Sequence, residues 1–185
     1  MKKRRFILLD CDGTIIVKKD YLSNPDHVEL LPGVPDTLKE LKKMGFGLLV
    51  ITNQSGIGRK YFSFETLSKV HQKLIDLLFE KGVNLDGIYY CPHIPEDNCL
   101  CRKPKAGMVE KAKTEHGFDP KLCFVIGDNK GDIGLGKNIS AVTILVRTGH
   151  GKEVEREVNA DYVVDNFEDV LPIIKVKLAK ETINT

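Results

Sequence analysis

Residues 6–14 read FILLDCDGT, four consecutive apolar residues followed by two aspartates, a glycine and a threonine. A short continuous apolar run is typical of a parallel strand that is buried on both faces. Side chains two positions apart in an extended segment point to the same side, and Gly13 permits a tight turn directly afterwards. We therefore expect a buried strand whose carboxyl end presents Asp10 and Asp12 together.

Similar apolar runs recur along the chain and alternate with amphipathic stretches. We expect further strands at residues 47–51, 87–90, 122–126, 141–146 and 162–164. The intervening patterns predict helices at residues 34–44, from Ser63 to Gly82, at 108–116, immediately before residue 141, and from Phe167 onward. Repeated strand–helix units predict a three-layer, Rossmann-like α/β fold, with one parallel sheet and helices on both faces.

Length, composition and charge favour one globular domain. The chain has 185 residues, 42% of them hydrophobic, and no evident linker or repeat, so we expect a single domain over residues 1–185. No apolar run reaches the roughly 18 residues needed to cross a membrane. The 28 basic and 26 acidic residues nearly balance, which gives no electrostatic case for a nucleic-acid partner. We expect a cytoplasmic monomer that acts on a small molecule.

Polar side chains follow several of the expected strands. Asp10 and Asp12 follow the first strand, Thr52 ends the second, and Asp128 follows the fourth. Adjacent carboxylates repel each other unless a cation or a shared proton intervenes, and Mg²⁺ prefers hard oxygen ligands such as Asp10 and Asp128. A carboxylate attacks a phosphate group only when the negative charge of that phosphate is neutralised by a metal ion and by a lysine such as Lys103. The pattern indicates chemistry on a phosphate group, and a merely charged loop edge is the plainer alternative.

A second cluster of polar residues occupies residues 91–101. It contains four ligand-type side chains, Cys91, His93, Cys99 and Cys101. Three thiolates and one imidazole complete a tetrahedral zinc site without an open position for water, which predicts a structural zinc. Zinc would hold this loop and direct Arg102 and Lys103, the next two residues. The alternative is a loop of reduced cysteines without a metal.

The order of these residues resembles the four motifs of the haloacid dehalogenase superfamily of phosphatases. The matching positions are Asp10, Asp12, Gly13 and Thr14, then Thr52 and Asn53, then Lys103, then Gly127, Asp128 and Asp132. Other segments look like the branch of D-glycero-D-manno-heptose 1,7-bisphosphate phosphatases: TNQSGI at 52–57, CPH at 91–93, CRKP at 101–104, GM at 107–108 and LVRTG at 145–149. The likeness spans about residues 6–151.

The resemblance implies a magnesium-dependent phosphomonoesterase without a large cap domain. By that resemblance Asp10 is the nucleophile that becomes an aspartyl phosphate, and Asp12 is the general acid and base. The implied magnesium ligands are Asp10, the main-chain carbonyl of Asp12, and Asp128. The groups implied to steady the phosphoryl group are Thr52, Arg102 and Lys103. The implied substrate contacts are Lys18, Lys19, Asp20, Tyr21, Asn53, Gln54 and Ser55.

Some positions depart from the family pattern. Cys11 stands where the family usually has arginine, and Asn129 stands where it commonly has lysine. We expect the Cys11 side chain to face away from the chemistry. The short spacing from His93 to Cys99 resembles the histidinol-phosphate phosphatases of the same branch.

Two substrates are therefore open: the 7-phosphate of the heptose bisphosphate, which we favour, and histidinol phosphate. An alternative from another class is a catalytically silent, zinc-stabilised binding module. A third alternative is a phosphatase of nucleic-acid ends from the same superfamily.

Overall fold

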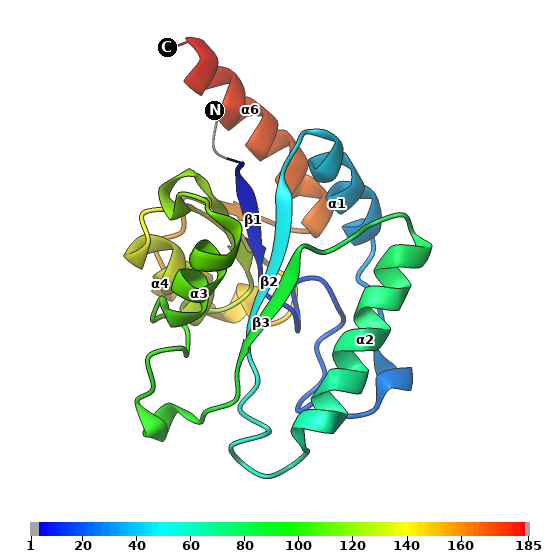
Figure 1. Ribbon diagram of the computed structural model, residues 1–185. Helices are drawn as coiled ribbons and strands as arrows, with labels where there is room; N and C mark the ends of the chain where they lie inside the picture. Colours follow the sequence, from blue (N-terminus) through cyan, green and yellow to red (C-terminus); the bar gives the residue numbers. More distant parts are fainter. Residues whose placement is uncertain (1–3, 184–185) are drawn as a thin grey trace.

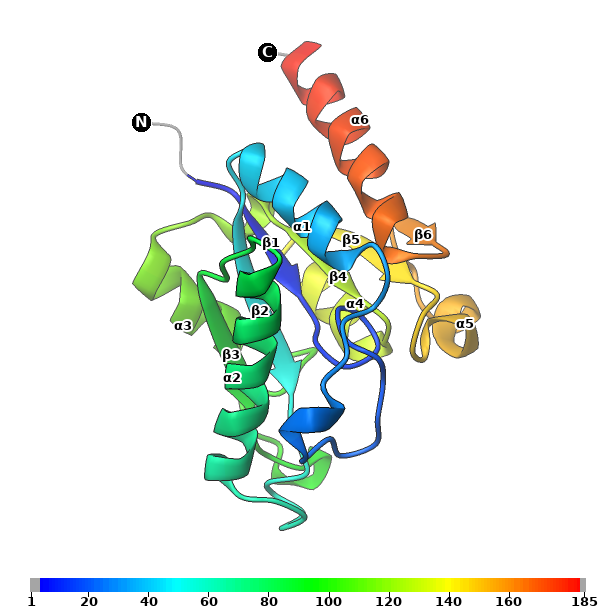
Figure 2. The ribbon, with the colours of Figure 1, turned by 90° about the vertical axis from the view of Figure 1, so that its right-hand side faces the viewer.

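The centre of the protein is one six-stranded parallel sheet with the strand order β3-β2-β1-β4-β5-β6 (Figures 1 and 2). The computed structural model describes residues 4–183, so the first three and last two residues of the expected domain lie outside the described part. The strands are β1 (Phe6–Leu9), β2 (Gly47–Asn53), β3 (Gly87–Cys91), β4 (Phe124–Gly127), β5 (Val142–Val146) and β6 (Tyr162–Val164).

Helices cover both faces of this sheet. One face carries α1 (Val34–Lys43), α2 (Phe64–Glu80) and α6 (Val170–Ile183), and the other carries α3 (Gly107–His116) and α4 (Lys130–Asn138) (Figures 1 and 2). A short helix, α5 (Gly151–Val154), follows β5. The predicted three-layer α/β fold is confirmed.

Alternate residues of β1 enter two separate hydrophobic cores. Ile7 and Leu9 join the core that lies against α1, α2 and α6, whereas Phe6 and Leu8 join the core against α3. All four side chains are at most 1% exposed. A strand covered on both faces needs apolar residues at every position, which explains the uninterrupted FILL run.

Several element boundaries differ from the sequence prediction by one or two residues, and at two of them the structure has a 3-10 turn. β4 begins at Phe124 rather than at residue 122, because residues 120–122 form a 3-10 turn that begins with Pro120. The Asp119 side chain accepts a hydrogen bond from the Lys121 main-chain N–H and so favours the turn over an extended strand. The last helix likewise begins with a 3-10 turn at Phe167–Asp169 before α6.

The loops after β1, β2 and β3 all lie beyond the same end of the sheet (Figures 1 and 2). Residues 17–31 cross this end and contain one 3-10 turn, Pro25–His27. In the described chain no folded insertion covers the end of the sheet, in agreement with the expected lack of a large cap. None of the helices within residues 4–183 combines the length and the apolar character of a membrane span.

Gly47→Ala should lower the free energy of unfolding by about 1–3 kcal/mol. An added Cβ would lie 2.1 Å from the Phe6 ring, which is itself packed on Phe118 with ring centroids 4.7 Å apart. Urea unfolding followed by circular dichroism measures the loss. Gly131→Ala in α4 is a matched control, because its Cβ would meet the nearest atom at 3.5 Å and alanine favours a helix, so stability should be equal or higher. Equal stabilities of Gly47→Ala and the unchanged protein would contradict the packing argument.

Candidate active site

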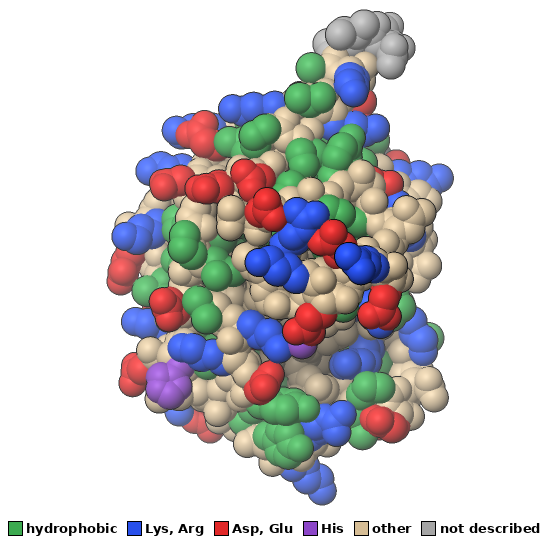
Figure 3. Space-filling model, turned by 180° about the vertical axis from the view of Figure 1, so that it is seen from behind, with side chains coloured by type: hydrophobic (Ala, Val, Ile, Leu, Met, Phe, Trp, Pro, Cys, Tyr) green, Lys and Arg blue, Asp and Glu red, His purple; other side chains and the backbone are tan. Residues whose placement is uncertain are grey.

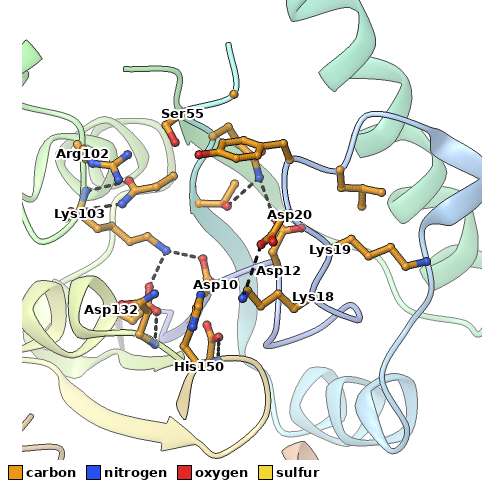
Figure 4. Close-up of a pocket in the computed structure, with 18 residues that line it drawn as sticks. Asp10, Asp12, Lys18, Lys19, Asp20, Ser55, Arg102, Lys103, Asp132 and His150 are labelled. Atoms are coloured by element: carbon orange, nitrogen blue, oxygen red, sulfur yellow. Dashed lines mark hydrogen bonds and ion pairs between the residues drawn. The ribbon is translucent and has the colours of Figure 1, made fainter. Parts of the chain in front are cut away.

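A pocket of about 330 Å³ opens at the carboxyl ends of the strands. Every residue predicted for catalysis, phosphoryl stabilisation, substrate contact or magnesium lines this pocket: Asp10, Asp12, Lys18, Lys19, Asp20, Tyr21, Thr52, Asn53, Gln54, Ser55, Arg102, Lys103 and Asp128. The structure therefore brings together side chains from five separate segments of the chain (Figure 4).

The ammonium group of Lys103 lies at the centre of the site. Its Nζ is 2.5 Å from Asp10 Oδ1, 2.6 Å from Asp132 Oδ1 and 2.5 Å from the main-chain oxygen of Ile51 (Figure 4). Burial by itself would lower the pKa of Lys103, but the charges of Asp10 and Asp132 outweigh it and raise that pKa above the usual value. Lys103 is therefore a permanent cation beside the Asp10 carboxylate.

Carboxylates gather next to this lysine. Asp10, Asp128 and Asp132 can each place one oxygen within 4.8 Å of the others. Burial, followed by the charges of Asp10 and Asp132, raises the pKa of Asp128 to about 8. A bound cation removes that repulsion, so the donor set fits Mg²⁺, which takes hard oxygen ligands.

Asp128 is oriented from two sides. Its Oδ2 accepts a hydrogen bond from the His150 main-chain N–H at 2.7 Å, and its Oδ1 lies 3.4 Å from the Thr14 hydroxyl, which donates to it. The glycines at 13 and 149 leave room for this carboxylate, because a Cβ at either position would meet Asp128 Oδ2, at 2.5 Å and 1.9 Å respectively. Both glycines also have positive φ, which suits residues without a side chain.

Asp132 is a site residue to which the sequence prediction gave no role. Its Oδ1 accepts from Lys103, and its Oδ2 accepts from the Asn129 main-chain N–H at 3.0 Å. Both oxygens are thus engaged within the protein, and Asp132 is a direct partner of the central lysine. Its position in the sequence, four residues after Asp128 and in the first turn of α4, is the feature that could have indicated a role in the site.

Asp12 has a different environment from Asp10. Burial, and then the charge of Asp10, raise the pKa of Asp12 to about 6, and the hydrogen bond from Gln54 partly opposes this. The Gln54 side-chain amide donates to Asp12 Oδ2 at 2.9 Å and to the Thr52 hydroxyl at 3.1 Å. Asp12 is therefore oriented, and a raised pKa suits a group that gives up and regains a proton.

Asn53 was predicted to contact substrate, but its side chain is engaged with the protein. Its Oδ1 accepts from the main-chain N–H of Lys103 at 3.0 Å, and its Nδ2 donates to the Lys103 carbonyl at 3.3 Å. Asn53 thus fixes the backbone on which the central lysine is carried.

The segment 18–21 forms one rim of the pocket. Lys18 lies 3.7 Å from Asp20, and both are labelled beside Asp12 in Figure 4. Lys19 points away from the carboxylates, and its Nζ donates to the His27 carbonyl at 2.7 Å. Lys19 therefore lines the rim, but its ammonium group binds the loop at residues 17–31 and not the centre of the pocket.

The two departures from the family pattern have clear places in the structure. Cys11 is 2% exposed and belongs to the core against α1, so its side chain faces away from the pocket as predicted. Asn129 lines the pocket, whereas the Lys130 ammonium pairs with Glu157.

The four predicted zinc ligands converge at the end of β3. The sulfurs of Cys91, Cys99 and Cys101 are 3.1–3.5 Å apart. The His93 Nδ1 lies 3.6 Å from Cys91 Sγ and 3.3 Å from Cys101 Sγ. Zinc–sulfur bonds of about 2.3 Å in a tetrahedron set neighbouring sulfurs about 3.8 Å apart, so these four atoms are close enough to share one such ion.

The electrostatics of the same cluster also favour a cation. Burial, and then the adjacent sulfur of Cys101, raise the pKa of Cys91 above its usual value. Three thiolates held this closely repel one another unless a positive ion lies between them.

Arg102 connects this cluster to the pocket. Its main-chain N–H donates to Cys99 Sγ, and its Nη1 donates to the His93 carbonyl at 3.2 Å. Arg102 also lines the pocket beside Lys103 (Figure 4). The loop conformation at the cysteines therefore sets the position of the arginine.

Comparisons with known proteins agree with this geometry. A family model described as HAD-hydrolase-like matches residues 100–170. The D-glycero-beta-D-manno-heptose-1,7-bisphosphate 7-phosphatase of Haemophilus influenzae is 42% identical, covering 91% of this chain and 96% of its own. The enzyme of the same name from Escherichia coli K12 is 41% identical, covering 91% and 93%.

A solved structure is similar over nearly the whole chain. It is the D,D-heptose 1,7-bisphosphate phosphatase from B. bronchiseptica complexed with magnesium and phosphate. It superposes with a TM-score of 0.86 at 28% identity and covers 94% of this chain and 99% of its own.

The parallel sheet, the carboxylates at its carboxyl end and the buried lysine define a phosphatase of the haloacid dehalogenase class. Within that class, relatives of about 40% identity match almost the full length. The chain belongs to the family of the D-glycero-beta-D-manno-heptose-1,7-bisphosphate 7-phosphatases.

Gly149→Ala should reduce phosphatase turnover by roughly 100-fold while the protein stays folded. The new Cβ would lie 1.9 Å from Asp128 Oδ2 and would push this carboxylate out of the site. Steady-state turnover at saturating Mg²⁺ measures the effect, and circular dichroism checks the fold.

Gly117→Ala is the matched control for this substitution. Gly117 also has positive φ, and no atom lies within 4 Å of its added Cβ, so any loss from backbone strain is common to both variants. Similar turnover in the two variants would contradict the role given to the space around Asp128.

Proposed function

We propose that the protein hydrolyses a phosphate monoester by nucleophilic attack of Asp10, and that its substrate is D-glycero-beta-D-manno-heptose 1,7-bisphosphate, cleaved at the 7-phosphate. The observation that supports this most directly is the 2.5 Å contact between the Lys103 ammonium and Asp10 Oδ1 inside an open pocket. The substrate is suggested by the names of relatives that match this chain at 41–42% identity.

In the first step, a carboxylate oxygen of Asp10 attacks phosphorus. The bond between phosphorus and the sugar oxygen breaks, and the protonated carboxyl of Asp12 gives its proton to that leaving oxygen. Lys103 holds Asp10 in place and, with Arg102 and the Thr52 hydroxyl, stabilises negative charge on the transferring group. The product of this step is an aspartyl phosphate at Asp10.

In the second step, the Asp12 carboxylate takes a proton from water, and the water oxygen attacks phosphorus. The bond to Asp10 breaks, inorganic phosphate leaves, and both aspartates return to their starting states. The pKa of about 6 for Asp12 and its hydrogen bond from Gln54 support its use as acid and then as base.

We assign a magnesium site to Asp10 and Asp128, whose carboxylate oxygens lie within 4.8 Å of each other, and to the Asp12 main-chain carbonyl, which the family resemblance implies. Magnesium bound there would supply positive charge beside the phosphate group. The zinc site is assigned to Cys91, His93, Cys99 and Cys101, with a structural role.

The shape of the pocket supports a small phosphorylated metabolite as substrate. No cap covers the site in the part of the chain that the structure describes, and the rim at 18–21 together with Ser55 offers polar groups to the rest of the substrate molecule. Every residue used in the two steps above belongs to this chain, so the proposed reaction needs no second copy, and we further propose that the protein acts as a monomer.

Asp10→Asn should abolish turnover of the heptose bisphosphate, because an amide cannot form the acyl phosphate. Phosphate release measures the loss, and Asp76→Asn on the exposed side of α2 controls for the substitution itself. Unchanged turnover in Asp10→Asn would contradict the mechanism. The same assay with histidinol phosphate separates the two substrates, and a higher kcat/KM on histidinol phosphate would overturn the proposed one.

Removal of zinc should lower activity roughly 10–100-fold, because a loose loop misplaces Arg102 and Lys103. Cys99→Ala, or chelation followed by addition of Mg²⁺ alone, prepares zinc-free protein, and metal analysis verifies it. Cys123→Ala is the control, since this buried thiol lies outside the cluster and should leave the zinc content unchanged. Full activity in protein free of zinc would refute the role of the loop.

A further inference from the structure

Two tyrosines from different loops contact each other at the mouth of the pocket. The rings of Tyr21 and Tyr61 lie edge to face, with centroids 4.6 Å apart and an interplanar angle of 86°. Tyr21 lines the pocket and is 45% exposed, whereas Tyr61 lies outside the lining and is 60% exposed. Hydrophobic side chains gather near the lower end of the face in Figure 3, the end at which the loops after β1 and β2 lie.

Tyr21 has a backbone conformation that needs support. Its φ is +51°, in the left-handed region that residues with a side chain seldom adopt. Such residues stay there only where the surrounding structure holds them. The loop containing Tyr21 is joined at its base by the bridge between Ile16 and Leu30, so the ring contact with Tyr61 supplies support at its far end.

The loop that carries Tyr61 is firmly anchored. The Gln54 main-chain N–H donates to the Cys91 carbonyl at 2.7 Å, and the Gly58 N–H donates to the Pro92 carbonyl at 2.9 Å. Gly58 packs so closely that an added Cβ would lie 2.9 Å from that same carbonyl oxygen. Within the loop, the Tyr61 N–H donates to the Gly56 carbonyl at 2.8 Å. Tyr61 thus stands on a support that begins at the cysteine cluster.

We propose that Tyr61 is a positioning residue that holds Tyr21 as the side wall of the pocket mouth and thereby favours substrates with an extended leaving group. A tyrosine ring offers an apolar face to the C–H groups of a sugar chain and a hydroxyl to its oxygens. A phosphate ester too small to reach the mouth gains nothing from this wall. The inference rests on the proposed function, because the sugar bisphosphate is the extended substrate used to test it.

Tyr61→Ala should raise KM for the heptose bisphosphate about three- to tenfold, as expected for loss of an aromatic pair, with little change in kcat. Its kcat/KM for acetyl phosphate, which has a small leaving group, should stay at the level of the unchanged protein. Tyr61→Phe keeps the ring and should restore the KM. Phe79→Ala removes an exposed aromatic ring on α2, away from the pocket, and should leave both substrates unaffected.

A double-mutant cycle tests whether Tyr61 acts through Tyr21. If it does, Tyr61→Ala should add no further increase in KM to a Tyr21→Ala protein, whereas independent roles would add. An unchanged KM in Tyr61→Ala, equal losses on both substrates, or additive effects would each overturn the inference. Failure of the unchanged protein to hydrolyse the heptose bisphosphate, with acetyl phosphate still turned over, would instead count against the proposed substrate.

Discussion

The buried ammonium of Lys103 is the interaction on which the rest of the site depends. Its Nζ lies within 2.6 Å of Asp10, Asp132 and the Ile51 carbonyl. Asp10 follows β1, Ile51 belongs to β2, and Asp132 lies in α4, the helix after β4. A buried charge is unfavourable unless its partners compensate, and breaking such a pair costs about 3–5 kcal/mol. The same contact therefore joins the ends of the central strands and places positive charge next to the Asp10 carboxylate, the proposed nucleophile. Stability of the sheet end and readiness for phosphate chemistry are consequences of one arrangement.

The main chain of the lysine is fixed as firmly as its side chain. Asn53 binds both the N–H and the carbonyl of Lys103, and the residue before it, Arg102, is bound to the cysteine cluster through its own N–H. The main-chain carbonyls of Cys91 and Pro92, at the start of the same segment, accept the hydrogen bonds that hold the loop after β2. The loop after β2 and the segment with Arg102 and Lys103 are thus both held by residues at the end of β3. This explains why the loop at residues 91–101, which has few apolar residues, can place Arg102 and Lys103 accurately.

Much of this arrangement could be predicted from the sequence. Buried parallel strands can be recognised in a sequence because both of their faces are covered, so every position is apolar. The polar residues that follow such strands lie at the same edge of the sheet and therefore close together. What the sequence did not reveal depends on contacts between distant segments. The engagement of Asn53 with Lys103, the pairing of Asp132 with the same lysine and the support of Asp128 by the His150 N–H each require the folded geometry. The 3-10 turn before β4 was missed because an apolar residue there looks like strand, while the local capping at Asp119 decides otherwise.

The position of β1 in the sheet has a consequence for how the protein is made. This strand is synthesised before the other strands of the sheet, yet it lies in the middle of the sheet, between β2 and β4. The main-chain groups on one edge of β1 stay unpaired until β4 is available, because Ile7 pairs with Phe124. Pairings so distant in sequence form slowly, and an unpaired strand edge invites association with other chains. The nascent chain is therefore most exposed to aggregation during the interval between synthesis of β1 and synthesis of β4.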